Sequence, residues 1–243
     1  LQDILRKKLL VTIVFSFNNS ASADAWHGFT LKWYESLLAD GSLINSAFRS
    51  LFLAATSATC ATVVGTIIAI ALHRYRFIGQ KVVYGSLSVI MLSPEIIQGI
   101  SLVMIFVILG IPLGFATLLL SHTIFCFPFV TVTVLARLKG VNRNLAESGA
   151  DLGASDVDIV RFILIPLILP AVFAGWLMSF TLSIDDVIIS FFVSGKNYEI
   201  LPMKIYSMVR TGIQPDVNAL CAALFFATFF VVMISYRLVR GKR

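Results

Sequence analysis

Long apolar segments alternate with short polar ones along this chain. Five segments reach the roughly 20 apolar residues that a helix needs to cross a bilayer, and they cover residues 47–72, 82–110, 115–135, 167–192 and 219–236. A shorter apolar run, Leu9 to Phe17, precedes them, and we interpret it as part of a short first span over residues 4–18. The pattern predicts an all-α, polytopic membrane protein with six transmembrane helices in a single domain of residues 1–243.

Small residues recur every four positions on the second of these spans. They are Ser57, Ala61, Gly65 and Ala69. Small side chains at this spacing let a neighbouring helix approach closely. We therefore expect this stripe to be a helix-packing face.

The composition agrees with a membrane protein. Of the 243 residues, 58% are hydrophobic and 13% are charged, against about 25% charged in a typical soluble domain. The net charge of +6 is spread over short clusters between apolar runs, which argues against nucleic-acid binding. The three cysteines, Cys60, Cys126 and Cys221, lie inside apolar runs without Cys or His partners at metal-ligand spacing, which excludes a disulfide framework and a zinc site.

The positions of Lys and Arg set the expected orientation, because cytoplasmic loops carry an excess of them. With six spans, 14 of the 19 Lys and Arg residues fall on the side that holds both termini and 5 on the other. We therefore expect both termini in the cytoplasm. Residues 18–46 and 194–218 would then be extracytoplasmic, and the long loop 136–166 cytoplasmic.

The loop 136–166 has the signals of two short helices. Asn144 followed by Glu147 predicts a helix start, and Gly153 predicts its end. Ser155 followed by Asp158 predicts a second helix start. The loop is therefore expected to form a helix, a glycine turn and a second helix. Such a hairpin is either an ordinary connection between two spans or a rigid surface that docks into a partner protein.

The same loop resembles a known motif. The segment Glu147-Ser-Gly-Ala-Asp-Leu-Gly153, followed after nine residues by Ile163-Leu-Ile-Pro166, is similar to the EAA loop of ABC-importer permeases. That motif reads E-A-A, three residues, G, nine residues, I-x-L-P. Ser148 and Gly149 replace the two alanines, and Ile165 replaces the leucine.

The resemblance extends over nearly the whole chain. Further segments are similar to the spermidine/putrescine permeases of the PotC type, namely His73–Phe77, Leu92–Ile96, Leu182–Val187, Phe191–Gly195 and Tyr198–Pro202. The resemblance implies the fold of a type I ABC-importer permease in a bacterial inner membrane. It implies as partners a second permease subunit that is a paralogue, two ATP-binding subunits and an extracytoplasmic polyamine-binding protein, all within membrane lipid. It also implies that the EAA-like loop couples to the ATPase through Glu147, Gly149, Asp151, Gly153, Ala154 and Ser155.

Three acidic residues fall inside the predicted spans: Glu95, Asp185 and Asp186. A carboxylate near the centre of a bilayer costs roughly 2.5–3.5 kcal/mol on insertion scales. Such groups are either paired residues that fix helix packing or the lining of a path for a cationic substrate. Both interpretations stay open at this point.

The two aspartates differ in their helical position. Asp186 shares a stripe with Ser179, Ser183 and Ser190, which would suit a hydrated substrate path. Asp185 lies about 100° away, which favours a helix–helix contact or the edge of the path. The two carboxylates point the same way only if the helix breaks.

Glu95 follows Ser93 and Pro94, a pair typical of a helix start. The third span is therefore expected to break and restart here, with Gln98 on the restarted face; otherwise Pro94 only kinks a packed helix. Broken helices at membrane depth are frequent at transporter sites.

Three further side chains are candidates for the substrate path or for packing. Trp176 and Tyr84 could offer cation–π faces to an ammonium group, although aromatic residues at such positions more often lie at the membrane interface or in the core. His122 is more often a hydrogen-bonded packing residue than a proton relay.

We interpret the chain as the permease subunit of an ATP-driven importer that moves polyamines into the cytoplasm. It has no phosphate-binding loop of the G-x-x-x-x-G-K-[ST] type, so it is expected to be non-catalytic and without a cofactor, with ATP bound by partner subunits. The alternative is an ion-coupled secondary transporter or a channel for organic cations. A permease for amino acids or anions is disfavoured by three intramembrane acids without intramembrane Lys or Arg.

Overall fold

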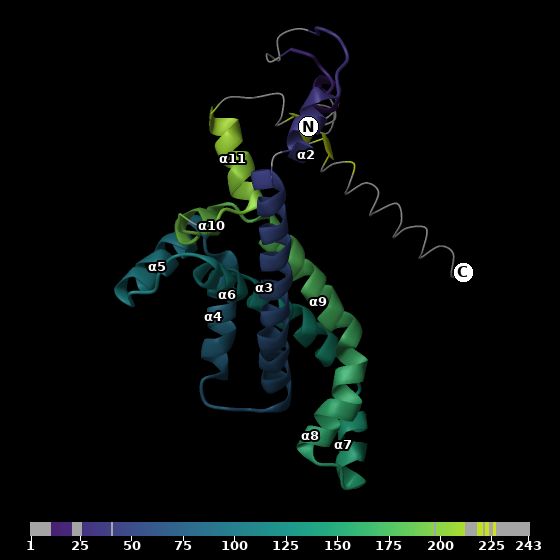
Figure 1. Cartoon of the computed structure of the whole chain (residues 1–243). Coiled ribbons are helices and arrows are strands. Elements are labelled where there is room, and N and C mark those ends of the chain that lie inside the picture. Colours follow the sequence, from purple (N-terminus) through teal and green to yellow (C-terminus); the bar gives the residue numbers. More distant parts are fainter. Residues whose placement is uncertain are drawn as a thin grey trace, which may run out of the picture. The chain divides into compact units, whose positions relative to one another are not determined.

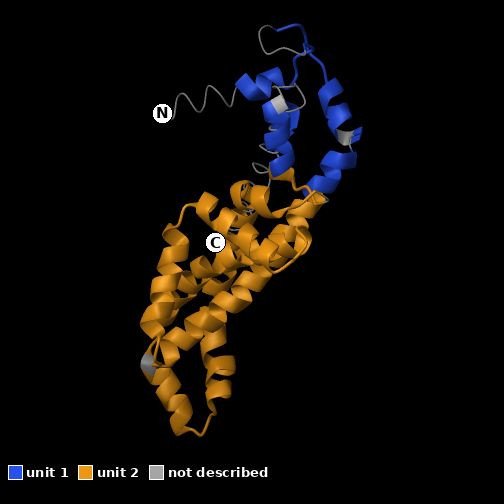
Figure 2. Ribbon diagram, turned by 90° about the vertical axis from the view of Figure 1, so that its left-hand side faces the viewer, with its two compact units in different colours: residues 1–47, 203–243 blue, residues 48–202 orange. Residues whose placement is uncertain are grey.

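The computed structural model describes residues 11–20, 26–39, 41–196, 198–211, 218–220, 222–223 and 226. The first part of the predicted first span, nearly all of the predicted span 219–236 and the basic end Arg237–Arg243 lie outside the described residues. The chain forms two compact units, residues 1–47 with 203–243 and residues 48–202 (Figure 2).

Helices dominate the second unit (Figure 1). Among the described residues, three helices are long and apolar enough to cross a membrane. They are α3 (Gly41–Arg74), α6 (Phe115–Lys139) and the continuous helix Asp156–Asp185, while α4 (Gln80–Leu92) and α5 (Glu95–Ile108) would together form a fourth, bent span. The apolar spans predicted at 47–72 and 115–135 correspond to α3 and α6, but α3 begins six residues earlier than predicted, at Gly41.

The predicted span 82–110 is not one straight helix. α4 and α5 meet at an angle of 112° across Ser93 and Pro94. The break expected at Ser93-Pro94 is therefore confirmed, since Pro94 lacks the N–H that would continue the α4 ladder and its φ of −57° with ψ of 134° is extended. α4 lies beside α6, whereas α5 packs against α10 (Ile188–Val193).

The stripe of small residues on α3 is a packing face, as predicted. Ser57, Ala61 and Ala69 are fully buried. A Cβ atom added at Gly65 would lie 2.8 Å from the carbonyl oxygen of Phe127 and 2.8 Å from the Cβ atom of Val130, both on α6. Only glycine lets these two helices approach so closely at this point.

The predicted span 167–192 differs from the structure at both ends. Its helix begins upstream, because α8 (Asp156–Asp158), a π-helical segment η1 (Ile159–Leu164) and α9 (Ile165–Asp185) follow one another without interruption. The wider π turn before Pro166 accommodates a proline without ending the helix. The helix then ends at Asp185, and the short α10 starts separately at Ile188.

A hydrophobic cluster holds α3, α4, α6, η1 and α9 together. Leu138, Ile159 and Leu164 are buried in it, and Ala154 of the glycine turn packs against it. The hairpin after α6 is thus anchored to the helix ends and is not a slack loop. In Figure 1, α7 (Arg143–Asp151) and α8 lie at the end of α9 that is opposite to α10.

The first unit contains α2 (Lys32–Ala39) and most of α11 (Leu201–Thr211). Residues 11–15 are helical and are followed by a turn at residues 16–17, and an antiparallel bridge joins Asn18 to Phe29. The indole Nε1 of Trp33 donates a hydrogen bond to the Asn18 carbonyl oxygen at 2.7 Å. Within the predicted first span, the described residues are therefore helical over 11–15 and form a turn at 16–17.

Candidate functional site

The break between α4 and α5 is stabilised by side chains. The N-cap of α5 is Pro94, and the hydroxyl of Ser93 donates backwards to the Val89 carbonyl oxygen at 2.6 Å, so Ser93 is not the N-cap expected from the sequence. The side-chain amide of Gln98 donates to the carbonyl oxygens of Ile90, at 2.8 Å, and Ser93, at 3.0 Å. Gln98 thus satisfies carbonyl groups at the end of α4 that the break leaves without helical partners.

A second break separates α9 from α10 at Asp186. The backbone of Asp186 is extended, with φ of −68° and ψ of 121°. Its carboxylate accepts hydrogen bonds from the backbone N–H of Ile189, at 3.2 Å, and of Ser190, at 2.8 Å. The hydroxyl of Ser190 also donates to it at 2.8 Å. Asp186 therefore caps the start of α10, where N–H groups lack helical partners.

His122 of α6 links the two sides of this break. Its Nδ1 atom lies 2.7 Å from Oγ of Ser183, on the last turn of α9, and its Nε2 atom lies 2.9 Å from Oγ of Ser190, on α10. Nε2 is 3.5 Å from a carboxylate oxygen of Asp186. The hydroxyl of Ser57 on α3 extends the network to Ser183 at 2.9 Å. The expectation that His122 is a hydrogen-bonded packing residue is confirmed.

The serine stripe along Asp186 is closed off within this chain. Ser179, Ser183 and Ser190 are buried, and only 7% of the Asp186 surface is exposed. The stripe also does not continue along one helix, because α9 ends at Asp185 and α10 starts separately at Ile188. The structure thus places Asp186 behind the surface and not on an open path.

Asp185 and Glu95, by contrast, are exposed. Asp185 is the last residue of α9 and Glu95 the first residue of α5, so each lies at one of the two helix breaks. The two breaks are neighbours, because α5, which Glu95 starts, packs against α10, which Asp185 and Asp186 precede. The three acids that the sequence singled out therefore gather in one place, with two on the surface and one buried.

Close packing of α5 on α10 brings the two breaks together. A Cβ atom added at Gly99 would lie 2.6 Å from the ring of Phe192 and 3.4 Å from the Cα atom of Ile189. Gly99 follows Glu95 by one helical turn, and Ile189 lies in the first turn of α10. This role of Gly99 is not visible in the sequence, since a single glycine in an apolar run does not reveal which helix it faces.

The two aromatic candidates lie elsewhere. Trp176 donates a hydrogen bond from Nε1 to the hydroxyl of Thr59 at 3.1 Å and stacks with Phe173 and Phe180 on the same helix. It precedes Asp185 by nine residues, which corresponds to about 13 Å along α9. Tyr84 is partly buried and packs against the hydrophobic cluster that anchors the hairpin.

The hairpin after α6 begins with an asparagine cap, but at a different position from the one predicted. The side chain of Asn142 accepts a hydrogen bond from the backbone N–H of Asn144 at 3.1 Å, and α7 begins at Arg143. Asn144 therefore lies inside the helix and is not its N-cap. Both asparagines are good N-caps. Which of them caps α7 depends on where α6 ends, and its C-cap is Gly140.

Gly153 ends α7, as predicted. Its φ of +85° lies in the left-handed region that favours glycine. The N–H of Gly153 donates to the carbonyl oxygen of Ala150 at 2.9 Å, and the N–H of Ala154 donates to that of Gly149 at 3.0 Å. These two bonds are those of a Schellman motif, which fixes the angle at which the chain leaves the helix.

The second helix start at Ser155 is also confirmed. The Ser155 side chain accepts from the N–H of Asp158 at 3.3 Å, and the Asp158 carboxylate accepts from the N–H of Ser155 at 3.2 Å. Gly149 allows α7 to pack on the following segment, because a Cβ atom there would lie 2.8 Å from Cδ1 of Ile163. Gly149 therefore allows this close packing, although glycine is a weaker helix former than alanine.

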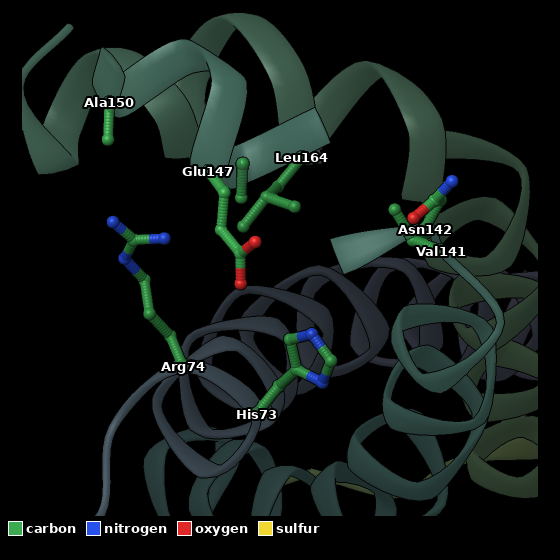
Figure 3. Close-up of a pocket in the computed structure, with 8 residues that line it drawn as sticks. His73, Arg74, Val141, Asn142, Glu147, Ala150 and Leu164 are labelled. Carbon is green, nitrogen blue, oxygen red and sulfur yellow. The ribbon is translucent and has the colours of Figure 1, made fainter. Parts of the chain in front are cut away.

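An open pocket of about 210 Å³ lies between the end of α3 and α7. Figure 3 shows the Glu147 carboxylate pointing into it, towards the side where His73 and Arg74 lie. Arg74 forms an ion pair with Asp156 at the start of α8. Beside the pocket, the tip of the hairpin exposes the apolar side chain of Leu152, at 89%. Asp151 is exposed on the same tip.

Comparisons with known proteins agree with this arrangement. Residues 61–241 match the family described as binding-protein-dependent transport system inner membrane component. The chain is 51% identical to the spermidine/putrescine transport system permease protein PotC of Escherichia coli, over 96% of this chain and 89% of that protein. It is 47% identical to the protein of the same name from Haemophilus influenzae, over 96% and 90%. It is 36% identical to the putrescine transport system permease protein PotI of Escherichia coli, over 95% and 85%.

Solved structures show a similar fold at low sequence identity. A chain of the MetNI methionine ABC transporter in an inward-facing conformation matches with a TM-score of 0.66 and 20% identity, over 83% of this chain and 96% of that one. A chain of an amino acid ABC transporter matches with a TM-score of 0.63 and 18% identity, over 88% and 100%. The helical arrangement described above is therefore a fold that chains of these two ABC transporters share.

Proposed function

We propose, since this chain belongs to the family of binding-protein-dependent transport system inner membrane components, that it is the permease subunit of an ATP-driven importer that moves spermidine or putrescine into the cytoplasm. The observation that carries the substrate class is the gathering of Glu95, Asp185 and Asp186 where two membrane helices break. Anionic groups at a helix break within the membrane suit a polycation in transit.

Glu95 and Asp185 form the part of this site that a substrate can reach from the surface of the chain. We assign them the direct contacts with ammonium groups, because both are exposed while Asp186 is buried. Asp186 and Ser183 do not contact the substrate in this proposal. Their hydrogen bonds stabilise the break between α9 and α10 beneath the exposed acids. Trp176 and Tyr84 would line the path further towards the hairpin. A few carboxylates suit a path better than a cage of many, since the substrate must also leave.

The pocket and tip of the hairpin serve as the docking surface for an ATP-binding subunit. The acidic and apolar side chains there, Glu147, Asp151 and Leu152, are offered by a turn that Gly153, Ala154 and Ser155 hold rigid. Gly149 sets the distance between α7 and the next segment. A rigid hairpin joined directly to α9 can transmit movement of the ATP-binding subunit to the helix that carries Asp185.

The complete transporter would contain this chain, a second and paralogous permease, two ATP-binding subunits and an extracytoplasmic polyamine-binding protein. This chain would bind neither ATP nor another cofactor and would have no role with nucleic acid. It would lie in the bacterial inner membrane with six crossings and both termini in the cytoplasm.

Reconstitution tests the proposed function. The chain is co-expressed with a candidate permease, ATP-binding subunit and polyamine-binding protein, purified as a complex and placed in proteoliposomes. ATP-dependent uptake of radiolabelled spermidine or putrescine, with no uptake of methionine or glutamate, is the expected result. Uptake of polyamine without ATP but with an ion gradient would instead identify a secondary transporter.

A further inference from the structure

We propose that His122 is a positioning residue for the substrate path, because it fixes the angle between α9 and α10 and so the placement of Asp185 and Glu95. This inference rests on the proposed function. His122 itself is buried, with 1% of its surface exposed, and does not reach the surface where a substrate would pass.

The bonding pattern of the ring is determined by its neighbours. The hydroxyl of Ser190 has one proton and donates it to Asp186, so the Ser190 oxygen accepts from Nε2–H of His122 at 2.9 Å. In the neutral ring this leaves Nδ1 to accept from the hydroxyl of Ser183 at 2.7 Å. The Ser183 proton is then used on Nδ1, so the Ser183 oxygen accepts from the Ser57 hydroxyl at 2.9 Å, which is closer to Ser57 than its other acceptor, the Ala54 carbonyl oxygen at 3.3 Å. Each ring nitrogen is therefore bonded to a different side of the break.

Asp186 alone cannot fix this angle. Among the described residues, the hydrogen bonds that its carboxylate accepts come from Ile189 and Ser190 of α10, and so it defines where α10 starts. Within the described part of the chain, the carboxylate forms no hydrogen bond to the turns of α9 that precede it. His122 supplies the missing link, because its two nitrogens bond one residue of α9 and one residue of α10 from a third helix.

The position of α10 in turn determines that of α5. Phe192 and Ile189 of α10 fit against Gly99, and Glu95 lies one turn before Gly99 on the same helix. A rotation of α10 would therefore move Glu95 as well as Asp185. Loss of His122 is expected to disturb both surface carboxylates at once, although it contacts neither.

Cys126 offers a native reporter for the packing around His122. It follows His122 by one turn of α6, is fully buried, and its Sγ atom lies 3.6 Å from the carbonyl oxygen of Ser179 on α9. A shift of α9 or α10 would expose it. The reporter requires Cys60 and Cys221 to be replaced by serine, so that Cys126 is the one remaining thiol of the chain.

The test compares three substitutions in this background, within the complete transporter in proteoliposomes. His122→Ala removes both ring bonds, His122→Gln keeps an acceptor and a donor, and Thr123→Ala is the matched control. The Thr123 hydroxyl donates to the Leu119 carbonyl oxygen of its own helix, at 2.7 Å. The readouts are the amount of assembled complex, the apparent KM and maximal rate of polyamine uptake, and the rate at which N-ethylmaleimide modifies Cys126.

We expect His122→Ala to raise the apparent KM about tenfold per assembled complex and to raise the modification rate of Cys126 by a similar factor, since two buried hydrogen bonds are lost. Thr123→Ala should change neither, and His122→Gln should restore most of both. An unchanged KM together with a protected Cys126 in His122→Ala would overturn the proposal. If His122→Ala does not assemble, His122→Gln decides: a normal KM with a protected Cys126 supports the proposal, and a raised KM with a protected Cys126 overturns it.

The two proposals fail in different ways. If the wild-type transporter moves no polyamine, the proposed function is wrong, while the reactivity of Cys126 still reports whether His122 holds the helices around the break. If the wild type transports polyamine but His122→Ala does so with normal KM and packing, only the role of His122 is wrong.

Discussion

The guanidinium group of Arg74, the last residue of α3, is ion-paired with the carboxylate of Asp156, the first residue of α8. The hydroxyl of Tyr75 donates to the other oxygen of the same carboxylate at 3.4 Å. Arg74 and Asp156 are 82 positions apart in sequence, and their contact connects the hairpin to the end of α3. This ion pair lies beside the pocket into which Glu147 points. Replacing it therefore tests whether the hairpin couples ATP hydrolysis to transport.

Asp156→Asn should reduce polyamine uptake per ATP hydrolysed while assembly stays normal, because the hairpin loses its charged link to α3. The measurement is the ratio of uptake to phosphate release in proteoliposomes. The charge-swapped double variant Arg74→Asp with Asp156→Arg should recover part of the ratio. Equal ratios in the wild type and in Asp156→Asn would show that the ion pair does not contribute to coupling.

Gly153→Val should also uncouple ATP hydrolysis from transport. The φ of +85° at this position disfavours a β-branched residue, at a cost of about 1–2 kcal/mol, although no atom lies within 4 Å of an added Cβ atom. The turn would therefore change its conformation and redirect the tip of the hairpin. The same uptake and ATPase assays apply.

Gly153→Asn is the matched control for this prediction, since asparagine tolerates the left-handed region. It should keep coupling close to that of the wild type. Normal coupled transport by Gly153→Val at normal expression would contradict the docking role of the hairpin.

Gly99→Ala should destabilise the second unit and lower uptake. Its new Cβ atom would lie 2.6 Å from the ring of Phe192, and overpacking of this kind costs about 1–3 kcal/mol. Gly85→Ala on α4 is the control, because no atom lies within 4 Å of its added Cβ atom. The thermal unfolding midpoint of the purified complex in detergent should fall for Gly99→Ala and stay unchanged or rise for Gly85→Ala. A lower midpoint for both variants would indicate that the loss of stability does not come from the α5–α10 contact.

Local signals were predicted well from the sequence because their partners are near in the chain. Gly153 and Ser155 each complete their hydrogen bonds within five residues, so residue type and spacing were sufficient. The break at Pro94 was predictable for the same reason, since proline itself removes the N–H. The helix start was predicted at Asn144 but lies at Asn142, because both residues can cap and the end of α6 decides between them.

The break at Asp186 was not predictable in the same way. Neither glycine nor proline lies at positions 186 and 187, and the apolar residues on both sides of the two aspartates indicate one continuous helix. The bonds that compensate for the interruption come partly from His122, more than 60 residues earlier. Periodicity placed Ser183, Asp186 and Ser190 on one stripe, but it could not show that the stripe faces another helix of the same chain.

The predicted membrane orientation can be tested with thiol labelling. In a variant without native cysteines, a cysteine at Lys196 should react with an impermeant maleimide added outside intact cells, and a cysteine at Lys81 should react only after the membrane is opened. Both lysines are exposed in the structure. The reverse pattern would contradict the orientation inferred from the distribution of Lys and Arg.

The roles of the three intramembrane acids can be separated by removing their charges one at a time. Glu95→Gln and Asp185→Asn preserve shape at exposed positions, so each should assemble normally and lower polyamine uptake by about tenfold, as expected for the loss of one charge interaction in a low-dielectric path. Asp186→Asn should act differently. Its carboxylate accepts three hydrogen bonds, and an amide would direct a donor at other donors, so we expect less assembled complex or a lower unfolding midpoint.

Glu35→Gln serves as the control for these three variants, since Glu35 is an exposed acid on α2. It should leave uptake unchanged. Uptake is measured per assembled complex, which separates the effects on the path from those on folding. If Glu95→Gln and Asp185→Asn both transport polyamine at the wild-type rate, the surface acids are not the substrate contacts. If Asp186→Asn assembles normally and loses uptake, the buried carboxylate becomes accessible during transport, and the break between α9 and α10 must then open when the substrate passes.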